Sequence, residues 1–211
     1  MTQKTENTSQ VKITIKKPAR GRLTVKVDGV TSLIMHAFKN KEALREKPRK
    51  GQKRPPRNPE KEFQDSLYRM PDNSGYAFPA VAFKGAMVAA CREVELKMTE
   101  ARQLFFVSGV EDKELVRIIA HEEPIMREDV VRLAQGQADL RYRPEFPKWS
   151  AEIMIEYNAE MIDAEDIINL LDRAGWSVGI GEWRPERKGG NTFGRFEVKE
   201  IIKSEIERHE R

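Results

Sequence analysis

Apolar residues recur with two different periods along this chain. The order of the segments that show each period constrains the fold more than any other feature. Residues 11–16, 23–27 and 151–157 alternate apolar with polar positions, as half-buried strands do. Residues 79–94 and 163–174 place apolar side chains three and four positions apart, which predicts two amphipathic helices. This order predicts two β-α-β halves. We therefore expect an α+β fold with a ferredoxin-like or RRM-like antiparallel sheet, helices on one face and the other face left for a ligand.

Weaker signals complete this plan. Residues 115–120, 130–133 and 193–198 are predicted to form further short strands. Asp163 is a suitable N-cap for the second helix, and Gly175 stands where that helix should end. The second helix is therefore defined at both ends.

The length and the polar ends predict one domain. A chain of 211 residues can form a single large unit with a substantial core. Residues 1–10 are polar and expected to be disordered, and residues 11–198 should form the domain. Residues 199–211 form a charged tail, for which a helix is one option.

A long basic insertion is expected to interrupt the domain at about residues 39–75. Between residues 39 and 59 the apolar pattern is replaced by cations and prolines, so this stretch should be a mobile arm with almost nothing to bury. An excess of positive charge suits binding to the phosphates of a nucleic acid. The alternative is a solvated loop that keeps the protein soluble. The cations expected to contact nucleic acid here are Lys39, Lys47, Arg49, Lys50, Lys53, Arg54 and Arg57.

A second segment suited to a polyanion runs from Gly175 to Phe196, where glycines, cations and aromatic residues are interleaved. Glycine lets a backbone approach a phosphate closely, arginine and lysine supply charge, and aromatic faces can stack on bases. The segment matches neither the Walker nor the dinucleotide-binding glycine pattern. The alternative interpretation is a glycine-rich hairpin that only closes the domain.

Composition argues against several classes of protein. The net charge of +4 is small although 34% of residues are charged, so the placement of the cations matters more than their number. The single cysteine, Cys91, excludes an internal disulfide, and the three histidines lack metal-binding spacing, so no metal and no cofactor are expected. No run approaches the roughly 20 apolar residues that span a bilayer, so we expect a cytoplasmic protein without a membrane partner.

Three features, in this order, resemble the RAMP superfamily, which includes the repeated backbone subunits of CRISPR effector complexes. They are an early strand followed by a basic insertion, a helix that opens at residues 78–86, and a late glycine-rich segment that ends at residues 193–196. The residues that match the family's helix motif are Pro79, Phe83, Lys84 and Gly85, with Ala80 and Ala82 where hydroxyl residues are usual. The resemblance covers the framework of the domain but neither the insertion nor the tail.

The resemblance implies a modified RRM-like fold with a protruding finger. It also implies binding of single-stranded nucleic acid, RNA or DNA, along its backbone without strong sequence preference, by a homo-oligomer or filament. A stand-alone, phage-encoded relative would suit the size of the chain. The residues expected to line a groove on the folded body are His36, Lys84, Arg92, Arg141, Tyr142, Arg143, Arg184, Arg187, Lys188, Phe193 and Arg195. Aromatic residues considered for stacking on bases are Tyr142, Trp149, Trp183 and Phe193, whereas Trp176 is assigned to packing.

Two other functions stay open at this point. The chain could be an inhibitor or interaction protein of the anti-defence type that uses a RAMP-like surface to contact other proteins or to sequester a small nucleotide. It could also be a RAMP-type endoribonuclease with His36 as general base. The sequence places no second catalytic group beside His36, so no catalytic residue is assigned and binding is favoured over catalysis.

Overall fold

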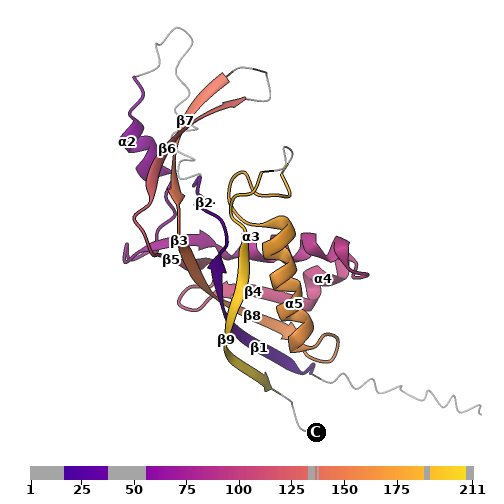
Figure 1. Cartoon of the computed structure of the whole chain (residues 1–211). Coiled ribbons are helices and arrows are strands. Elements are labelled where there is room, and N and C mark those ends of the chain that lie inside the picture. Colours follow the sequence, from indigo (N-terminus) through magenta and orange to yellow (C-terminus); the bar gives the residue numbers. More distant parts are fainter. Residues whose placement is uncertain (1–16, 38–55, 133–135, 137, 188–190, 208–211) are drawn as a thin grey trace, which may run out of the picture.

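Two antiparallel sheets, one packed beneath helices and a smaller one at its end, make up the computed structural model of this chain (Figure 1). The structure describes residues 17–37, 56–132, 136, 138–187 and 191–207. The strands are β1 (Arg20–Gly29), β2 (Leu33–Ile34), β3 (Tyr76–Pro79), β4 (Phe105–Gly109), β5 (Leu115–Ala120), β6 (Ile125–Arg132), β7 (Ala138–Phe146), β8 (Trp149–Asn158) and β9 (Phe196–Glu207). The helices are α2 (Pro59–Asp65), α3 (Ala80–Ala90), α4 (Met98–Leu104) and α5 (Ala164–Arg173), with a 3₁₀ turn η1 (Cys91–Glu93) and a π-helical turn η2 (Ala174–Val178).

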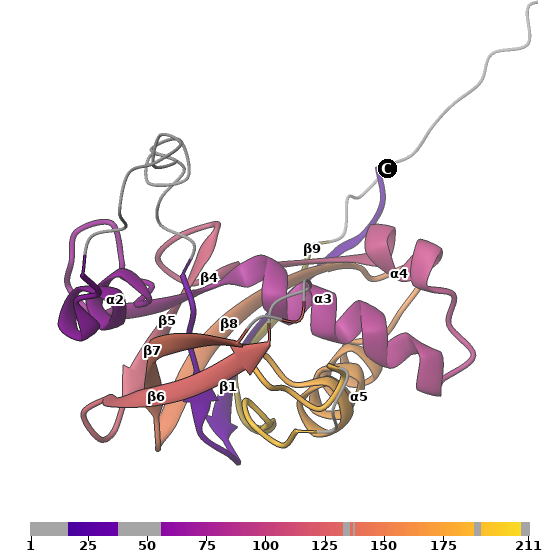
Figure 2. The same cartoon turned by 90° about the horizontal axis from the view of Figure 1, so that it is seen from above.

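The main sheet has the strand order β3-β5-β8-β1-β9, with β4 also paired to β8, and the small sheet has the order β2-β7-β6. All pairs within both sheets are antiparallel. Figures 1 and 2 show α3 and α5 against the main sheet. The predicted α+β architecture of ferredoxin-like or RRM-like type, with helices on one face, is confirmed.

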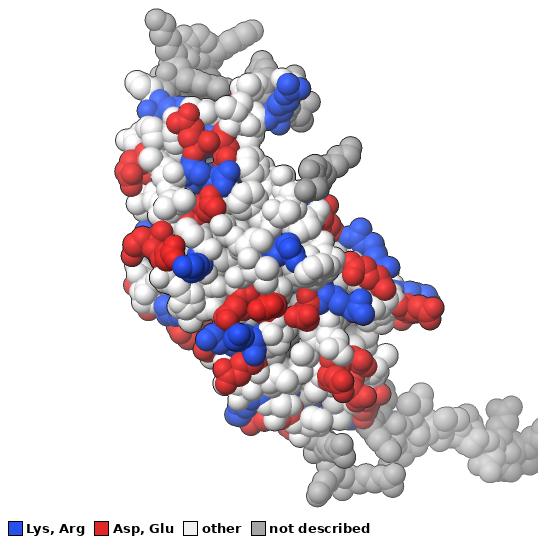
Figure 3. Space-filling model, viewed as in Figure 1, with Lys and Arg blue, Asp and Glu red and all other residues white. Residues whose placement is uncertain are grey.

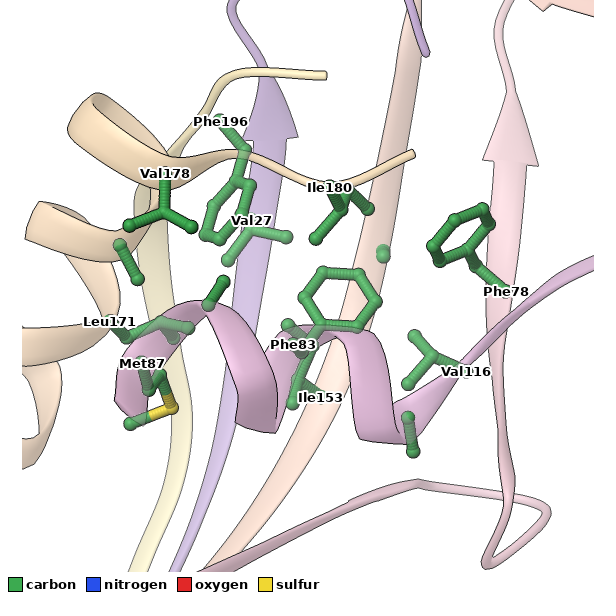
Figure 4. Close-up of a cluster of buried hydrophobic side chains, with 14 of the residues drawn as sticks. Val27, Phe78, Phe83, Met87, Val116, Ile153, Leu171, Val178, Ile180 and Phe196 are labelled. Atoms are coloured by element: carbon green, nitrogen blue, oxygen red, sulfur yellow. The ribbon is translucent and has the colours of Figure 1, made fainter. Parts of the chain in front are cut away.

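The core lies between α3 and the helix-side face of the main sheet. Phe83 and Met87 of α3 are fully buried, as the helical spacing predicts, and they belong to one cluster with Val27 of β1 and Ile153 of β8 (Figure 4). The ring of Phe83 lies 5.7 Å from that of Phe196, which opens β9. The start of β9 is therefore fixed by the core.

The opposite face of the main sheet carries a ladder of opposite charges. Arg22 and Lys26 of β1 stand across from Glu156 and Glu152 of β8, and the Arg22 guanidinium donates to the Glu156 carboxylate at 2.6 Å. This face was expected to receive a ligand. A groove lined by four arginines lies at the small sheet, as described below.

The end of α5 differs from the expectation. Asp163 stands at the N-cap position without a side-chain hydrogen bond to the helix, and the helix continues through η2 to Gly179, where φ is 68°. Gly175 lies inside this extension. A Cβ at Gly175 would be only 2.0 Å from the carbonyl oxygen of Phe196, so the glycine allows β9 to pass close to the helix rather than ending it.

Other differences lie in the second half of the chain and at the termini. Helix α4 and strand β4 were not predicted, because residues 98–109 show no clear period. The option of a helical tail is wrong for residues 199–207, which pair with β1 as far as Arg20 opposite Glu207. The expected disordered segment 1–10 and the strand at 11–16 lie outside the described residues.

No helix in the described part of the chain combines the length and the apolar character needed to cross a membrane.

Candidate nucleic-acid interface

A groove opens between the small sheet and the loop that follows η2. It has a volume of about 410 Å³. Its lining residues are Val130, Val131, Arg132, Arg141, Arg143, Glu182, Trp183, Arg187 and Asn191. We call it the arginine groove.

Backbone hydrogen bonds hold the glycine-rich loop against β2. The N–H of Glu182 donates to the carbonyl of Ile34 at 3.0 Å, and the N–H of Gly194 donates to the carbonyl of Ser32 at 2.7 Å. The N–H of Ile180 donates to the Gly194 carbonyl at 2.9 Å and so closes the loop on itself. Because β2 pairs with β7, these bonds also fix the loop relative to the small sheet.

Gly194 contributes close packing to this loop. Its φ is 68°, in the left-handed region, and a Cβ at this position would lie 1.8 Å from the carbonyl oxygen of Ile180. Its N–H is already bonded to Ser32. The N–H of Gly194 is therefore not available to a phosphate.

A chain of ion pairs crosses the floor of the groove. The buried carboxylate of Asp129 accepts hydrogen bonds from Arg143 at 2.6 Å and from Arg127 at 3.0 Å. Arg127 also donates to Glu145 at 2.5 Å. The side chain of Arg143 is only 1% exposed, so its charge needs this compensation in the folded protein.

The same chain reaches the loop on the other side of the groove. Arg143 lies 3.6 Å from the carboxylate of Glu182, and Glu182 accepts from Arg187 at 2.8 Å. Three of the four arginines that line the groove, Arg141, Arg143 and Arg187, therefore lie within 4.0 Å of an acid, so the groove is not a purely positive channel. Figure 3 likewise shows Lys and Arg beside Asp and Glu over the visible face.

Aromatic rings cover two of these arginines. The guanidinium of Arg127 lies 5.0 Å from the ring centres of both Trp183 and Phe193, and that of Arg143 lies 4.9 Å from Trp183. Trp183 has a φ of 55°, which is uncommon for a residue with a bulky side chain. Such backbone strain is concentrated at functional sites, and here it turns the indole into the arginine cluster.

His36 stands beside the groove. Its Nδ1 lies 3.5 Å from a guanidinium nitrogen of Arg141. Burial is the main cause that lowers the pKa of His36 below its usual range, with Arg141, Arg143 and Arg187 acting in the same direction and Glu182 opposing them. His36 is therefore neutral at pH 7.

The lowered pKa of His36 predicts a loss of stability in acid. As the pH falls below about 6.5, the unfolded chain binds a proton at His36 before the folded protein does, so the free energy of unfolding decreases until the lower pKa of the folded state is reached. We expect His36→Gln to remove this part of the decrease. Urea denaturation of both proteins at pH 7.5 and 5.5 measures it; equal decreases in the two proteins would contradict the prediction.

The chain is anchored on the same side of the molecule at both ends of segment 38–55 of the basic insertion. The N–H of Ala37 donates to the carbonyl of Ser66 at 2.9 Å, just after α2. Arg57 donates to the carbonyl of Leu140 and pairs with Asp139 of β7 at 2.6 Å. Both ends thus lie near β7, which supplies Arg141 and Arg143 to the groove.

No protein-family model and no curated protein sequence matches this chain. A solved structure shares its fold. The match is to a chain in the cryo-EM structure of the Type III-B Cmr-beta bound to cognate target RNA, with a TM-score of 0.55 and 12% sequence identity. It covers 90% of this chain and 61% of that chain. At this identity the likeness concerns the fold alone.

The structure brings together only part of the expected interface. His36, Arg141, Arg143, Arg187 and Phe193 meet at the groove or beside it. The predicted residues that lie outside the described part of the chain are Lys39, Lys47, Arg49, Lys50, Lys53, Arg54 and Lys188.

Other expected contacts lie elsewhere. Lys84 donates to the carbonyl of Arg102 at 3.0 Å, between α3 and α4. Arg92 and Arg184 both pair with Glu186, at 2.5 and 3.3 Å, on the α3 side of the loop. Arg195 lies against Trp176.

Three aromatic residues differ from the expectation. Tyr142 follows Arg141 along β7 and therefore points to the opposite face of the small sheet, so its contact with nucleic acid stays a prediction. Trp149 is 2% exposed and belongs to the core, where its indole N–H donates to the carbonyl of Thr31 at 2.9 Å. Trp176, in contrast, was assigned to packing and is 71% exposed.

Sequence reasoning missed the groove-lining residue Arg132, and also Arg127 and Asp129, which join the ion pairs beside the groove. They lie on β6, which begins five residues earlier than the strand predicted at residues 130–133. The sequence pattern at the start of β6 is weak, because the apolar residues Ile125 and Met126 are neighbours and both are exposed, so they do not alternate between a buried and an exposed face. In the described part of the chain, no cluster of three or more His, Cys, Asp or Glu side chains could hold a metal ion.

Proposed function

We propose that this protein binds single-stranded nucleic acid in the arginine groove, mainly through the phosphate backbone and without strong sequence preference. The observation that carries the proposal is the convergence of arginines, Trp183 and Phe193 at the small sheet, beside the base of the basic insertion. The fold shared with a chain from an RNA-bound structure makes RNA the first strand to test.

Phosphate would bind by competing with the carboxylates of the groove. Arg187 is 52% exposed and its partner Glu182 is 19% exposed, so this pair lies near solvent and can exchange partners at small cost. Arg132 is exposed at the groove wall. The buried pair of Arg143 and Asp129 would stay intact and keep the walls in place.

Bases would stack on aromatic faces at the groove. Trp183 is partly exposed and is held by Arg127 and Arg143. Stacking on a fixed ring is worth about 1–3 kcal/mol per base and is largely indifferent to sequence. This arrangement fits a protein that reads the backbone and accepts any base.

The test is the salt dependence of binding. Fluorescence anisotropy with labelled RNA and DNA strands of equal length should give affinities that fall with salt, with a log–log slope of about 0.7 per phosphate contacted. We expect Arg132→Gln and Arg187→Gln each to lower that slope by about 0.7.

The matched control is Arg22→Gln, because Arg22 lies in the charge ladder on the main sheet. It should leave the slope unchanged. An affinity that does not change with salt concentration would refute the proposal. Equal decreases of the slope in the control and in the groove variants would also refute it. Recovery of the RNA after the measurement, intact or cut, tests the ribonuclease alternative at the same time.

We also propose that several copies assemble along one strand. Edge strand β9 exposes Ile201, Ile202 and Ile206, each about half, beside charged residues. Its pairing with β1 has two register shifts, which discourage further backbone pairing and favour contact through side chains. Sedimentation with strands of increasing length should then give complexes that grow in equal steps.

A second candidate is an interaction protein that contacts another protein through β6. This strand forms the outer edge of the small sheet and exposes Ile125, Met126 and Val130. Apolar residues at an edge are typical of protein contacts. Absence of binding to RNA and DNA at low salt would favour this candidate.

A further inference from the structure

An exposed tryptophan stands on the turn between α5 and the glycine-rich loop. Trp176 is 71% exposed, although Gly175 before it and Val178 after it are buried. It lies in η2, and π-helical turns are rare and frequent at functional sites. The turn thus holds a large aromatic ring in solvent on a fixed backbone.

Arg195 covers one face of this ring. Its guanidinium carbon lies 4.2 Å from the centre of the Trp176 ring, within the range of a cation–π contact. The Nε–H of Arg195 donates to the carbonyl of Trp176 at 3.2 Å, which fixes the guanidinium over the indole. The indole and the guanidinium therefore form one rigid pair.

The backbone of Arg195 is anchored as well. Its N–H donates to the hydroxyl of Thr31 at 3.0 Å, and its carbonyl accepts from the N–H of Val30 at 2.9 Å. These bonds tie the segment to the turn between β1 and β2. The pair is thus held in place before any ligand arrives.

Arg195 also differs in its charge balance from the ion-paired arginines in and beside the groove. Arg127, Arg143 and Arg187 each contact a carboxylate. Among the residues that the structure describes, no carboxylate pairs with Arg195 within 4.0 Å. Its positive charge is therefore available to a phosphate without displacing an acid.

The pair is continuous with the arginine groove. Phe193 stacks on Arg127 beside the groove, and Arg195 follows two positions later on the same segment. Two residues of an extended chain span at most about 7 Å. The backbone positions of Phe193 and Arg195 are therefore at most about 7 Å apart, which is short enough for one nucleic-acid strand to contact both.

We propose that Trp176 and Arg195 form a stacking subsite for one base of a single-stranded nucleic acid, outside the arginine groove. The base would stack on the open face of the indole, and Arg195 would contact an adjacent phosphate. This inference rests on the proposed function and extends the site from the groove to η2.

The test compares strands with and without bases. Trp176→Ala should weaken binding of a normal single strand by about 5- to 150-fold and should leave its salt slope unchanged. Binding of an abasic strand of equal length should not change. Trp176→Phe should recover part of the affinity, and Arg195→Gln should lower the salt slope by about 0.7.

Met161→Ala is the matched control, because Met161 is 68% exposed at the other end of α5 and should have no effect on binding. Normal binding by Trp176→Ala would overturn this inference alone. Equal losses on normal and abasic strands would also overturn it, because Trp176 would then act through the fold. If the unaltered protein binds no strand at all, both this inference and the proposed function are refuted.

Discussion

Asp129→Ala is expected to lower the free energy of unfolding by about 3–5 kcal/mol, because it leaves a buried arginine without its counter-charge. Asp129 is 5% exposed and accepts from Arg143, whose side chain is 1% exposed, and from Arg127. Guanidine or urea denaturation measures the loss. Binding should also weaken, since β6 and β7 would lose the ion pairs that hold the groove floor.

The control for this prediction is Glu156→Ala, which removes an acid from an ion pair at the surface. Glu156 and Arg22 are both about half exposed, so water replaces the lost partner and stability should hardly change. A second variant tests the cause. Asp129→Leu combined with Arg143→Met removes both buried charges and should be much more stable than Asp129→Ala alone. Equal stability of these two variants would contradict the explanation.

Gly194→Ala is expected to destabilise the protein by at least about 3 kcal/mol. A residue other than glycine at a φ of 68° costs about 1–3 kcal/mol, and the added Cβ would lie 1.8 Å from the Ile180 carbonyl oxygen. The loop must move to relieve that contact. Because the loop carries Trp183 and Arg187, binding should fall together with stability.

Gly85→Ala is the matched control, since Gly85 lies on the exposed side of α3 and a Cβ there meets nothing within 4 Å. Alanine in a helix interior should raise stability by about 0.5–1 kcal/mol. The two variants are compared by their denaturation midpoints. A midpoint of Gly194→Ala at or above that of the original protein would show that the loop tolerates a side chain.

The elements that could be predicted from the sequence are those whose apolar period is regular. Leu23, Val25 and Val27 alternate and are fully buried in β1, and Phe83 and Met87 recur at helical spacing and are buried in α3. In each case the regularly spaced apolar residues lie on one face of a single strand or helix, and that face is buried. Local spacing is then enough to predict both the element and its buried side.

The candidate site could be predicted only as a set of residue types. Arg143 and Arg187 were expected to meet phosphate, but their acids, Asp129 and Glu182, stand elsewhere in the sequence and become partners only through the pairing of β6 with β7 and the path of the loop. Such compensation depends on tertiary contacts, which spacing along the chain does not reveal.

Two side chains, Tyr142 and Trp176, have directions that the sequence analysis did not anticipate, and the causes differ. The opposite direction of Tyr142 could have been predicted, because neighbouring residues of a strand alternate between faces and Arg141 and Arg143 share the other face. The exposure of Trp176 could not, because it depends on the π-helical turn that carries α5 past Gly175. A regular helix would have given that side chain another direction.

Ala37 and Arg57, on either side of segment 38–55, are both anchored near β7. This makes the length and charge of the segment between them largely independent of the stability of the folded body. The cost of closing a connection grows only slowly with its length, by about 0.6 kcal/mol for each doubling. Cations could therefore be added to or removed from this segment, or the segment lengthened, with little effect on the sheets that hold Ala37 and Arg57. The length and charge of this segment can therefore change while the folded body stays the same.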